Sequence, residues 1–236
     1  MFDWRWEEAE GHFRRALELD PDLAVARVWY SHLLTASGRF AESVAETERA
    51  WACEPLWPMV QVALGVALYF AGSIDPAVER LEKVLAIEPQ FALAHFHLGR
   101  ARTVQGQLEA AAAELEKAAP GFPLALAHLV ATWRRLGRSA RADGALNDLC
   151  RLSGTAYVGP LAWSCAYVDR RELRFGWLRR AFDEHDGPVA FLAVDPWVDD
   201  IRGDPEFGRL LERLGLPTLN RGAQGAQVPG ETKVTN

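Results

Sequence analysis

Apolar residues recur at helical spacing along much of the chain. Val28, Leu33 and Leu34 fall on one face of a predicted helix, and Phe40 and Val44 fall on one face of the next. Each run covers only about 12–15 residues, a length at which an isolated helix is barely stable in water. The pattern therefore predicts short amphipathic helices that bury their apolar faces against one another.

The breaks between these helices return at a fixed interval. A proline ends one helix and a glycine, half an interval later, ends the next: the prolines are Pro21, Pro55, Pro89 and Pro123, and the glycines are Gly38, Gly72 and Gly106. Proline cannot continue a helix, and glycine readily takes the left-handed conformation of a helix C-cap. Each period is therefore predicted to be a pair of helices.

A 34-residue helix-turn-helix unit with small residues at fixed positions resembles the tetratricopeptide repeat (TPR) family. The best-matching unit has Leu64, Gly65, Leu68, Gly72, Ala77, Leu81 and Pro89 at the family's positions, and the next has Leu98, Gly99, Gly106, Ala111, Leu115, Ala118 and Pro123. The unit before them departs more, with Tyr30, Ser31, Ser43 and Thr47, and the family's first-helix tryptophan is missing from every unit. The resemblance implies an all-α, right-handed α-solenoid that closes with a C-terminal capping helix.

The expected organisation is an array over residues 1–216 followed by a disordered tail at 217–236. Its parts are a half unit 1–21, units 22–55, 56–89, 90–122 and 123–154, a degenerate unit 155–186, and a cap 187–216 in which Asp204 and Pro205 begin the last helix. Because residues 1–21 match only the second half of a unit, we expect either a fragment of a longer protein or a partner that covers the apolar face of the first helix. The C-terminal end is similar to the TPR regions of bacterial multidomain signalling proteins, which carry winged-helix, kinase or cyclase domains.

Composition narrows the possible functions. The net charge of −6 and pI of about 5.6 give no overall attraction for nucleic acid. The sequence contains neither an apolar run long enough to span a bilayer nor a secretory leader, and its three cysteines form no paired motif, so we expect a cytoplasmic protein.

No catalytic or nucleotide-binding motif appears in the sequence, so no enzymatic activity and no cofactor are expected. The candidate metal ligands are His95, His97 and His128. Residues two apart lie on different faces of a helix and cannot both reach one ion, so buried, hydrogen-bonded histidines are the favoured interpretation and no metal site is predicted.

The family resemblance implies that the first helix of each unit lines a concave groove. The candidate partner-binding residues are Val28, His32, Met59, Val62, Val66, Tyr69, Phe70, Phe96, Arg100, Arg134 and Arg135. This groove is apolar and aromatic, unlike the Lys- and Asn-rich grooves that clamp a peptide carboxylate. Some of these residues could equally be ordinary core between neighbouring helices.

Charge changes sign farther along the chain. Between Arg134 and Arg180 there are ten arginines and four acidic residues. We therefore expect a scaffold that binds a peptide or helix of a partner protein, with an apolar strip followed by a basic stretch suited to an acidic or amphipathic segment. For the basic stretch, an equal alternative is that its arginines lie on a solvent-exposed outer face and bind no partner. For the whole chain, the alternative is an intramolecular regulatory or sensory region of a larger bacterial transcription regulator, kinase or cyclase.

Overall fold

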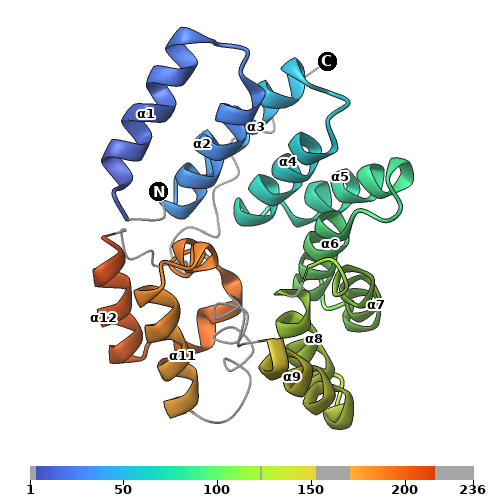
Figure 1. The fold of residues 1–236 in the computed structure, drawn as a ribbon. Helices are drawn as coiled ribbons and strands as arrows, with labels where there is room; N and C mark the ends of the chain where they lie inside the picture. Colours follow the sequence, from blue (N-terminus) through green and yellow to red (C-terminus); the bar gives the residue numbers. More distant parts are fainter. Residues whose placement is uncertain (1–3, 123, 153–170, 216–236) are drawn as a thin grey trace, which may run out of the picture.

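The computed structural model describes residues 4–122, 124–152 and 171–215, and every regular element in these ranges is helical. The chain forms an arc of stacked helices (Figure 1) in which α1 is followed by four helix pairs. The elements are α1 (Trp6–Leu19), α2 (Ala24–Ala36) with α3 (Phe40–Cys53), α4 (Pro58–Phe70) with α5 (Ile74–Ile87), α6 (Ala92–Val104) with α7 (Leu108–Ala118), and α8 (Leu124–Arg135) with α9 (Ser139–Leu152). The predicted all-α solenoid is confirmed.

Three parts of the predicted organisation lie outside the described residues. They are the fourth proline of the series, Pro123, the first part of the degenerate unit at 155–170, and the tail at 217–236. The expected division of the chain into units stays a prediction. Residues 171–183 of the degenerate unit form a helix, α11 (Arg171–Asp183).

The glycine of each period turns the chain from the first helix of a pair to the second. Gly38, Gly72, Gly106 and Gly137 have φ angles of 75°, 84°, 78° and 70°, in the left-handed region that glycine adopts without strain. Just after each glycine, a backbone N–H reaches back five residues to a helical carbonyl, as from Ser73 to Leu68 at 2.9 Å. This is the Schellman arrangement, and it fixes the angle between the two helices of each pair.

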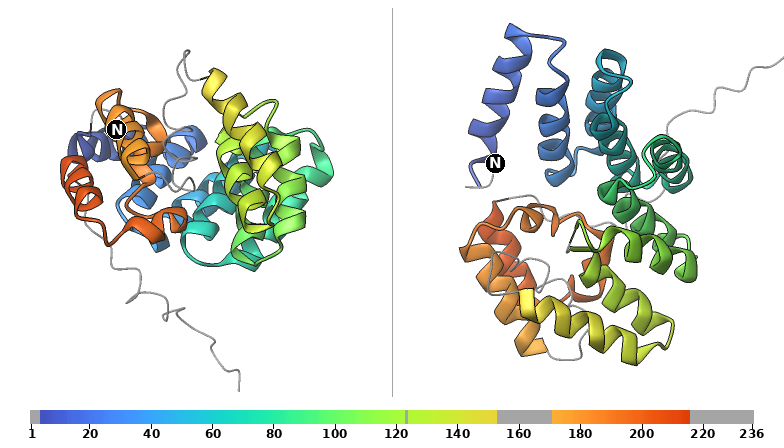
Figure 2. Two further views of the ribbon diagram at one scale, coloured as in Figure 1. Left: turned by 90° about the horizontal axis from the view of Figure 1, so that it is seen from below. Right: turned by 45° about the vertical axis from the view of Figure 1, so that its right-hand side comes forward.

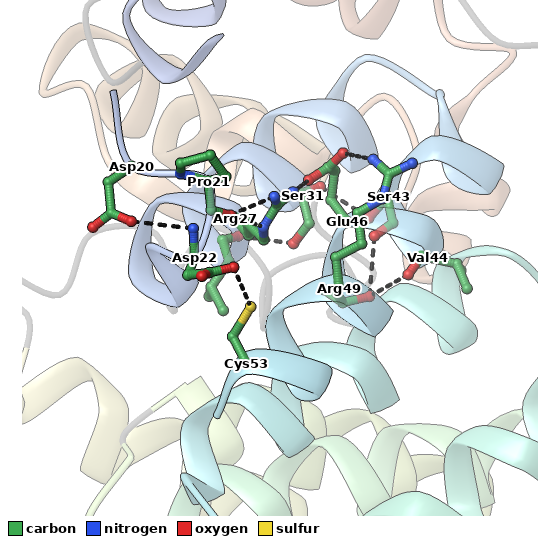
Figure 3. Close-up of polar contacts among 12 residues, drawn as sticks. Asp20, Pro21, Asp22, Arg27, Ser31, Ser43, Val44, Glu46, Arg49 and Cys53 are labelled. Atoms are coloured by element: carbon green, nitrogen blue, oxygen red, sulfur yellow. Dashed lines mark hydrogen bonds and ion pairs between the residues drawn. The ribbon is translucent and has the colours of Figure 1, made fainter. Parts of the chain in front are cut away.

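At the proline end of three successive periods, one side chain at a constant position ties the next helix to the turn. Arg27, Gln61 and His95 occupy the same place in successive repeats, and each contacts the carbonyl oxygen of the proline six residues earlier, at 2.5–3.1 Å. Figure 3 shows the first of these contacts, where Arg27 also pairs with Glu46 at 2.5 Å. The residue type changes along the chain, but the contact is retained because the backbone geometry repeats.

Within a pair, the two helices approach closely where a glycine faces a leucine. A Cβ atom added at Gly99 would lie 2.6 Å from Cγ of Leu115 and 3.1 Å from a backbone oxygen, closer than packed atoms allow. Gly65 faces Leu81 in the same way. These contacts explain why units 56–89 and 90–122 match the repeat pattern so well.

In unit 22–55, hydrogen bonds replace the glycine–leucine contact between the two helices. The Ser43 hydroxyl donates to the carbonyl oxygen of Ser31 at 2.9 Å and lies 2.7 Å from the Thr35 hydroxyl. The Thr47 hydroxyl donates back to its own helix at 2.9–3.0 Å. All four side chains are buried, so the departures from the pattern in this unit form a satisfied polar network between α2 and α3.

The C-terminal block comprises α11, η1 (Gly187–Phe191), η2 (Pro196–Ile201) and α12 (Pro205–Leu214). The predicted start of the last helix is confirmed, because Pro205 is its first residue and the Asp204 carboxylate accepts the backbone N–H of Glu206 at 2.8 Å. The apolar face of α12 buries Phe207, Leu210, Leu211 and Leu214. These side chains belong to the same core cluster as apolar residues of α4 and α6.

An end cap would stack only on the last helix pair of the arc. The C-terminal block instead packs across the concave side of the arc (Figure 2). It touches α2 through η1 and reaches the start of α1, where the Trp6 indole N–H donates to the carbonyl oxygen of Leu214 at 2.5 Å. Trp4 stacks on His185 of the block, with ring centroids 5.4 Å apart. The two ends of the described solenoid are therefore joined through the block.

The apolar face of α1 packs on α2. Trp6, Ala9, Phe13 and Leu17 lie against the buried cluster of Tyr30, Leu33 and Leu34. The rings of Phe13 and Tyr30 stack with centroids 6.0 Å apart. These four side chains of α1 are only partly buried, so α2 covers this face in part, and the expectation of a fragment or a covering partner stays a prediction.

We expect Gly99→Ala to lower the free energy of unfolding by about 1–3 kcal/mol, because the added methyl group overlaps Leu115 and a backbone oxygen. Gly144→Ala in α9 is the matched control, since its Cβ would meet no atom within 4 Å. That change should stabilise the protein by about 0.5–1 kcal/mol through helix propensity. Urea unfolding of the two variants checks both, and equal effects would contradict the close approach.

Candidate functional site

A cavity of about 280 Å³ lies between the concave face of the solenoid and the C-terminal block. The first helices of the four pairs, α2, α4, α6 and α8, supply most of its wall, and Gly187, Pro188 and Phe191 of η1 close one side. Residues at the same place in successive units line it together, as Met59 and Leu93 do. The repeat thus places equivalent side chains of neighbouring helices around one space, which we call the concave cavity.

Most of the predicted groove residues meet at the concave cavity. His32, Met59, Val62, Val66, Phe70, Phe96 and Arg100 line it. Phe70, Phe96 and Arg100 are each 5% exposed or less, so the open groove expected there is filled in part by the chain's own C-terminal block.

Four predicted groove residues lie elsewhere. Val28 is buried in a core cluster with Ala24, Ala50, Val60 and Ala63, as the core alternative proposed. Tyr69 is buried beside Arg100, whose guanidinium lies 4.6 Å from the centre of its ring. Arg134 and Arg135 are exposed at the end of α8, while the concave cavity contacts only the first half of that helix, so the structure does not bring the basic pair to the apolar groove.

A buried ion pair holds the C-terminal block to the concave face. A guanidinium nitrogen of Arg100 lies 2.5 Å from a carboxylate oxygen of Asp195, and both side chains are at most 6% exposed. Burial by itself lowers the pKa of Arg100, but the carboxylate of Asp195 and the neighbouring Tyr69 raise it above its ordinary value. Arg100 also lies over the rings of Tyr69, Phe70 and Phe96, so α4, α6 and the block meet at one cation.

Sequence reasoning did not identify the residues with which the block contacts the groove. One carboxylate oxygen of Asp195 pairs with Arg100, and the other accepts the backbone N–H of Trp197 at 3.0 Å. Phe191 stacks on Phe70 with ring centroids 5.7 Å apart, and Trp197 meets His128 edge to face at 4.1 Å. The sequence feature that could have indicated these contacts is an acidic residue, Asp195, close to two aromatic residues, Phe191 and Trp197, in a segment that breaks the repeat.

Three imidazoles lie at the concave cavity, and burial keeps all of them neutral near pH 7. Desolvation lowers the pKa of His32 to about 4, and it lowers the pKa of His97 and His128 well below the ordinary value, with a further contribution from the charge of Arg100. The cavity therefore carries one matched ion pair and three uncharged histidines.

His95 lies away from these histidines, as its two-residue spacing from His97 predicted. Its ring nitrogens contact the carboxylate of Glu114 at 2.5 Å and the carbonyl oxygen of Pro89 at 2.9 Å. Within the described ranges, no three His, Cys, Asp or Glu side chains gather as a metal site would require.

Residues 62–125 match the family model of the tetratricopeptide repeat. The match extends from α4 to the start of α8, where the proline and glycine marks are most regular. No relative was found among curated protein sequences.

Several solved TPR-type structures share the fold. Cut9–Hcn1 of the APC/C hetero-tetramer has a TM-score of 0.58 at 19% identity, covering 89% of this chain and 39% of that one. PilW, a widely conserved type IV pilus biogenesis factor, has 0.58 at 15% identity, covering 83% and 90%. TTC0263, a thermophilic TPR protein of Thermus thermophilus, has 0.55 at 19% identity, covering 82% and 100%. At these identities the likeness establishes the fold alone.

In the described parts of the chain, no helix is both long and apolar enough to cross a bilayer.

We expect Arg100→Met to lower the free energy of unfolding by about 3–5 kcal/mol, because it leaves the carboxylate of Asp195 buried without a counter-charge. The double variant Arg100→Met/Asp195→Asn should lose less than the single one, since an amide oxygen can still accept the N–H of Trp197. Lys83→Met is the control, as its ion pair with Glu79 is exposed on both sides (59% and 68%) and should contribute under about 1 kcal/mol. Denaturant unfolding of the set checks this, and additive losses in the double variant would contradict it.

Stability should fall on acidification because the unfolded chain takes up protons at histidines that stay neutral when folded. For His32, with a pKa lowered to about 4, the stabilisation is complete above about pH 6.5 and is lost as the pH falls toward 4. The loss between pH 7 and pH 5 should be about 2 kcal/mol for this residue.

His32→Phe should remove that share of the pH dependence in urea unfolding at the two pH values. His12→Gln is the matched control, because the His12 side chain is 78% exposed on α1. An unchanged difference between pH 7 and pH 5 in His32→Phe would show that His32 is not desolvated.

Proposed function

We propose that the chain is a protein-interaction scaffold that holds an apolar segment of a partner protein on its concave face, and that it is not an enzyme. The supporting observation is a group of exposed apolar side chains on α2 and just before α4, next to the walls of the concave cavity. Val25 and Trp29 of α2 are 40% and 44% exposed, and they stand one repeat before Met59 and Ala63, which line the concave cavity. Leu56 and Trp57, which lead into the neighbouring α4, are 88% and 39% exposed.

Two properties of the exposed strip (Val25, Trp29, Leu56, Trp57) suit recognition. Its residues stand on or beside helices that are already packed, so little conformational entropy is lost when a partner binds. Tryptophan is enriched among residues that dominate binding energy, because it covers a large area with few rotatable bonds. An extended or helical segment with bulky apolar side chains is the partner that this surface complements.

The test is selection of 12-residue peptides on the purified chain, followed by fluorescence anisotropy. Trp29→Ala and Trp57→Ala should each weaken the selected peptides at least tenfold. Trp51→Ala is the matched control, because Trp51 is 37% exposed on α3, the second helix of its pair, beneath Arg80. Equal losses from all three variants, or none from Trp29 and Trp57, would refute the assignment of the strip.

The preference for an acidic partner is a separate part of the proposal and rests on Arg134 and Arg135. If these exposed arginines contribute, Arg134→Glu/Arg135→Glu should weaken acidic peptides more than neutral ones, and added salt should reduce the difference. Unchanged affinity would remove the acidic preference and leave the apolar strip as the whole site.

The alternative function, an intramolecular regulatory region of a larger bacterial regulator, draws support from the C-terminal block. Phe191 and Asp195 occupy the concave face as a segment of the same chain, so this face is suited to intramolecular contacts. This alternative would be favoured if coding sequence continues upstream of Met1 in the same reading frame and encodes the effector domain of a cytoplasmic regulator.

A further inference from the structure

The concave cavity has the size of a small-molecule site. An apolar cavity of about 150 Å³ is large enough to hold benzene, so the 280 Å³ here corresponds to one or two rings. Phe70, Phe96, Phe122 and Phe191 contribute aromatic walls from α4, α6, the turn before α8, and η1. Such walls favour a flat apolar ligand through burial and ring contacts.

The electrostatics of the cavity exclude a strongly charged ligand. The positive charge of Arg100 is already matched by Asp195 at 2.5 Å, so an anion would meet the carboxylate as well as the guanidinium. His32, His97 and His128 are neutral because burial lowers their pKa values, and they offer no charge to a ligand of either sign. Removing an ion from water without a compensating partner is strongly unfavourable.

Polar atoms are nevertheless available to orient a ligand. The Nε–H group of Arg100 is fully covered by protein atoms and is not accessible from the cavity. His97 lines the same cavity beside Phe96, and its ring nitrogens can donate or accept a hydrogen bond there. A hydroxyl or carbonyl group on the ligand would therefore bond to His97.

We propose that the concave cavity binds a free, uncharged one- or two-ring compound that carries a hydroxyl or carbonyl group, held between the solenoid and the C-terminal block. This goes beyond the scaffold function and uses the interior behind the exposed strip. Trp29 and Met59, which are less buried than the deeper aromatic residues, lie where the ligand enters. Because α2, α4, α6, α8 and η1 all contact the cavity, a bound compound adds contacts between the block and the arc.

The probe is 2-naphthol, titrated into the full chain by calorimetry, with 2-naphthoate as its charged counterpart. We expect 2-naphthol to bind with a Kd of about 10–100 μM and 2-naphthoate to bind at least tenfold more weakly. Absence of 2-naphthol binding, or tighter binding of 2-naphthoate, would overturn the proposal.

Two variants locate the probe. Met59→Trp fills the cavity and should weaken 2-naphthol at least tenfold, whereas Val104→Trp, at an exposed α6 position outside the cavity, should not. His97→Phe retains a ring but removes its nitrogens, and it should weaken 2-naphthol about fivefold while leaving naphthalene within twofold. Circular dichroism and thermal unfolding establish that each variant is folded. Equal effects of Met59→Trp and Val104→Trp would place the probe outside the cavity and refute the assignment.

An aromatic side chain of a partner peptide offers the same chemistry as the free compound. N-acetyltryptophanamide, titrated beside 2-naphthol, separates the two sources. If it binds more tightly than 2-naphthol and the selected peptides compete with it, the cavity receives a partner's side chain and the proposal of a free compound fails. If 2-naphthol binds whether or not any peptide is selected, the cavity stands independently of the scaffold function.

Discussion

Helices of this length hold their shape only through their neighbours, and that constraint governs the whole molecule. Each pair in the arc buries one face against its own partner and another against the next pair. Close approach at Gly65 and Gly99 and the left-handed turns between helices follow from the same requirement, because neighbouring helices must meet at a nearly constant angle. The concave face, with its stripe of equivalent side chains, is a geometric result of that repetition.

Local constraints were readable from the sequence because they depend on residues close in the chain. Pro55 and Gly72 mark the limits of helix α4 through their own backbone chemistry, and the structure begins and ends that helix between them, with Gly72 in the left-handed region. The N-cap at Asp204 was predictable for the same reason. The positions of Phe70 and Phe96 on the concave side also followed, because register alone determines which face a helical residue occupies.

The contents of the concave face could not be read in this way. Arg100 and Asp195 are 95 residues apart, and no periodic pattern connects them. Register placed Arg100 in the groove, but it could not indicate that a segment of the same chain would neutralise its charge. Val28 shows that register alone also cannot separate core from cavity wall. Val28 lies in a core cluster, whereas Val62 and Phe96, at the same position in the next two units, line the concave cavity.

Many-helix arrays of stacked repeats have two free ends from which they can unravel one unit at a time. In this chain, the indole N–H of Trp6 is hydrogen-bonded to the last turn of α12. In addition, η1 and Asp195 contact the middle of the arc, where Asp195 pairs with Arg100. Fraying of α1 therefore has to break its contacts with the C-terminal block as well. Contacts between such distant parts of the chain favour collective unfolding, as in a compact globular domain, even though the architecture is built from a linear repeat.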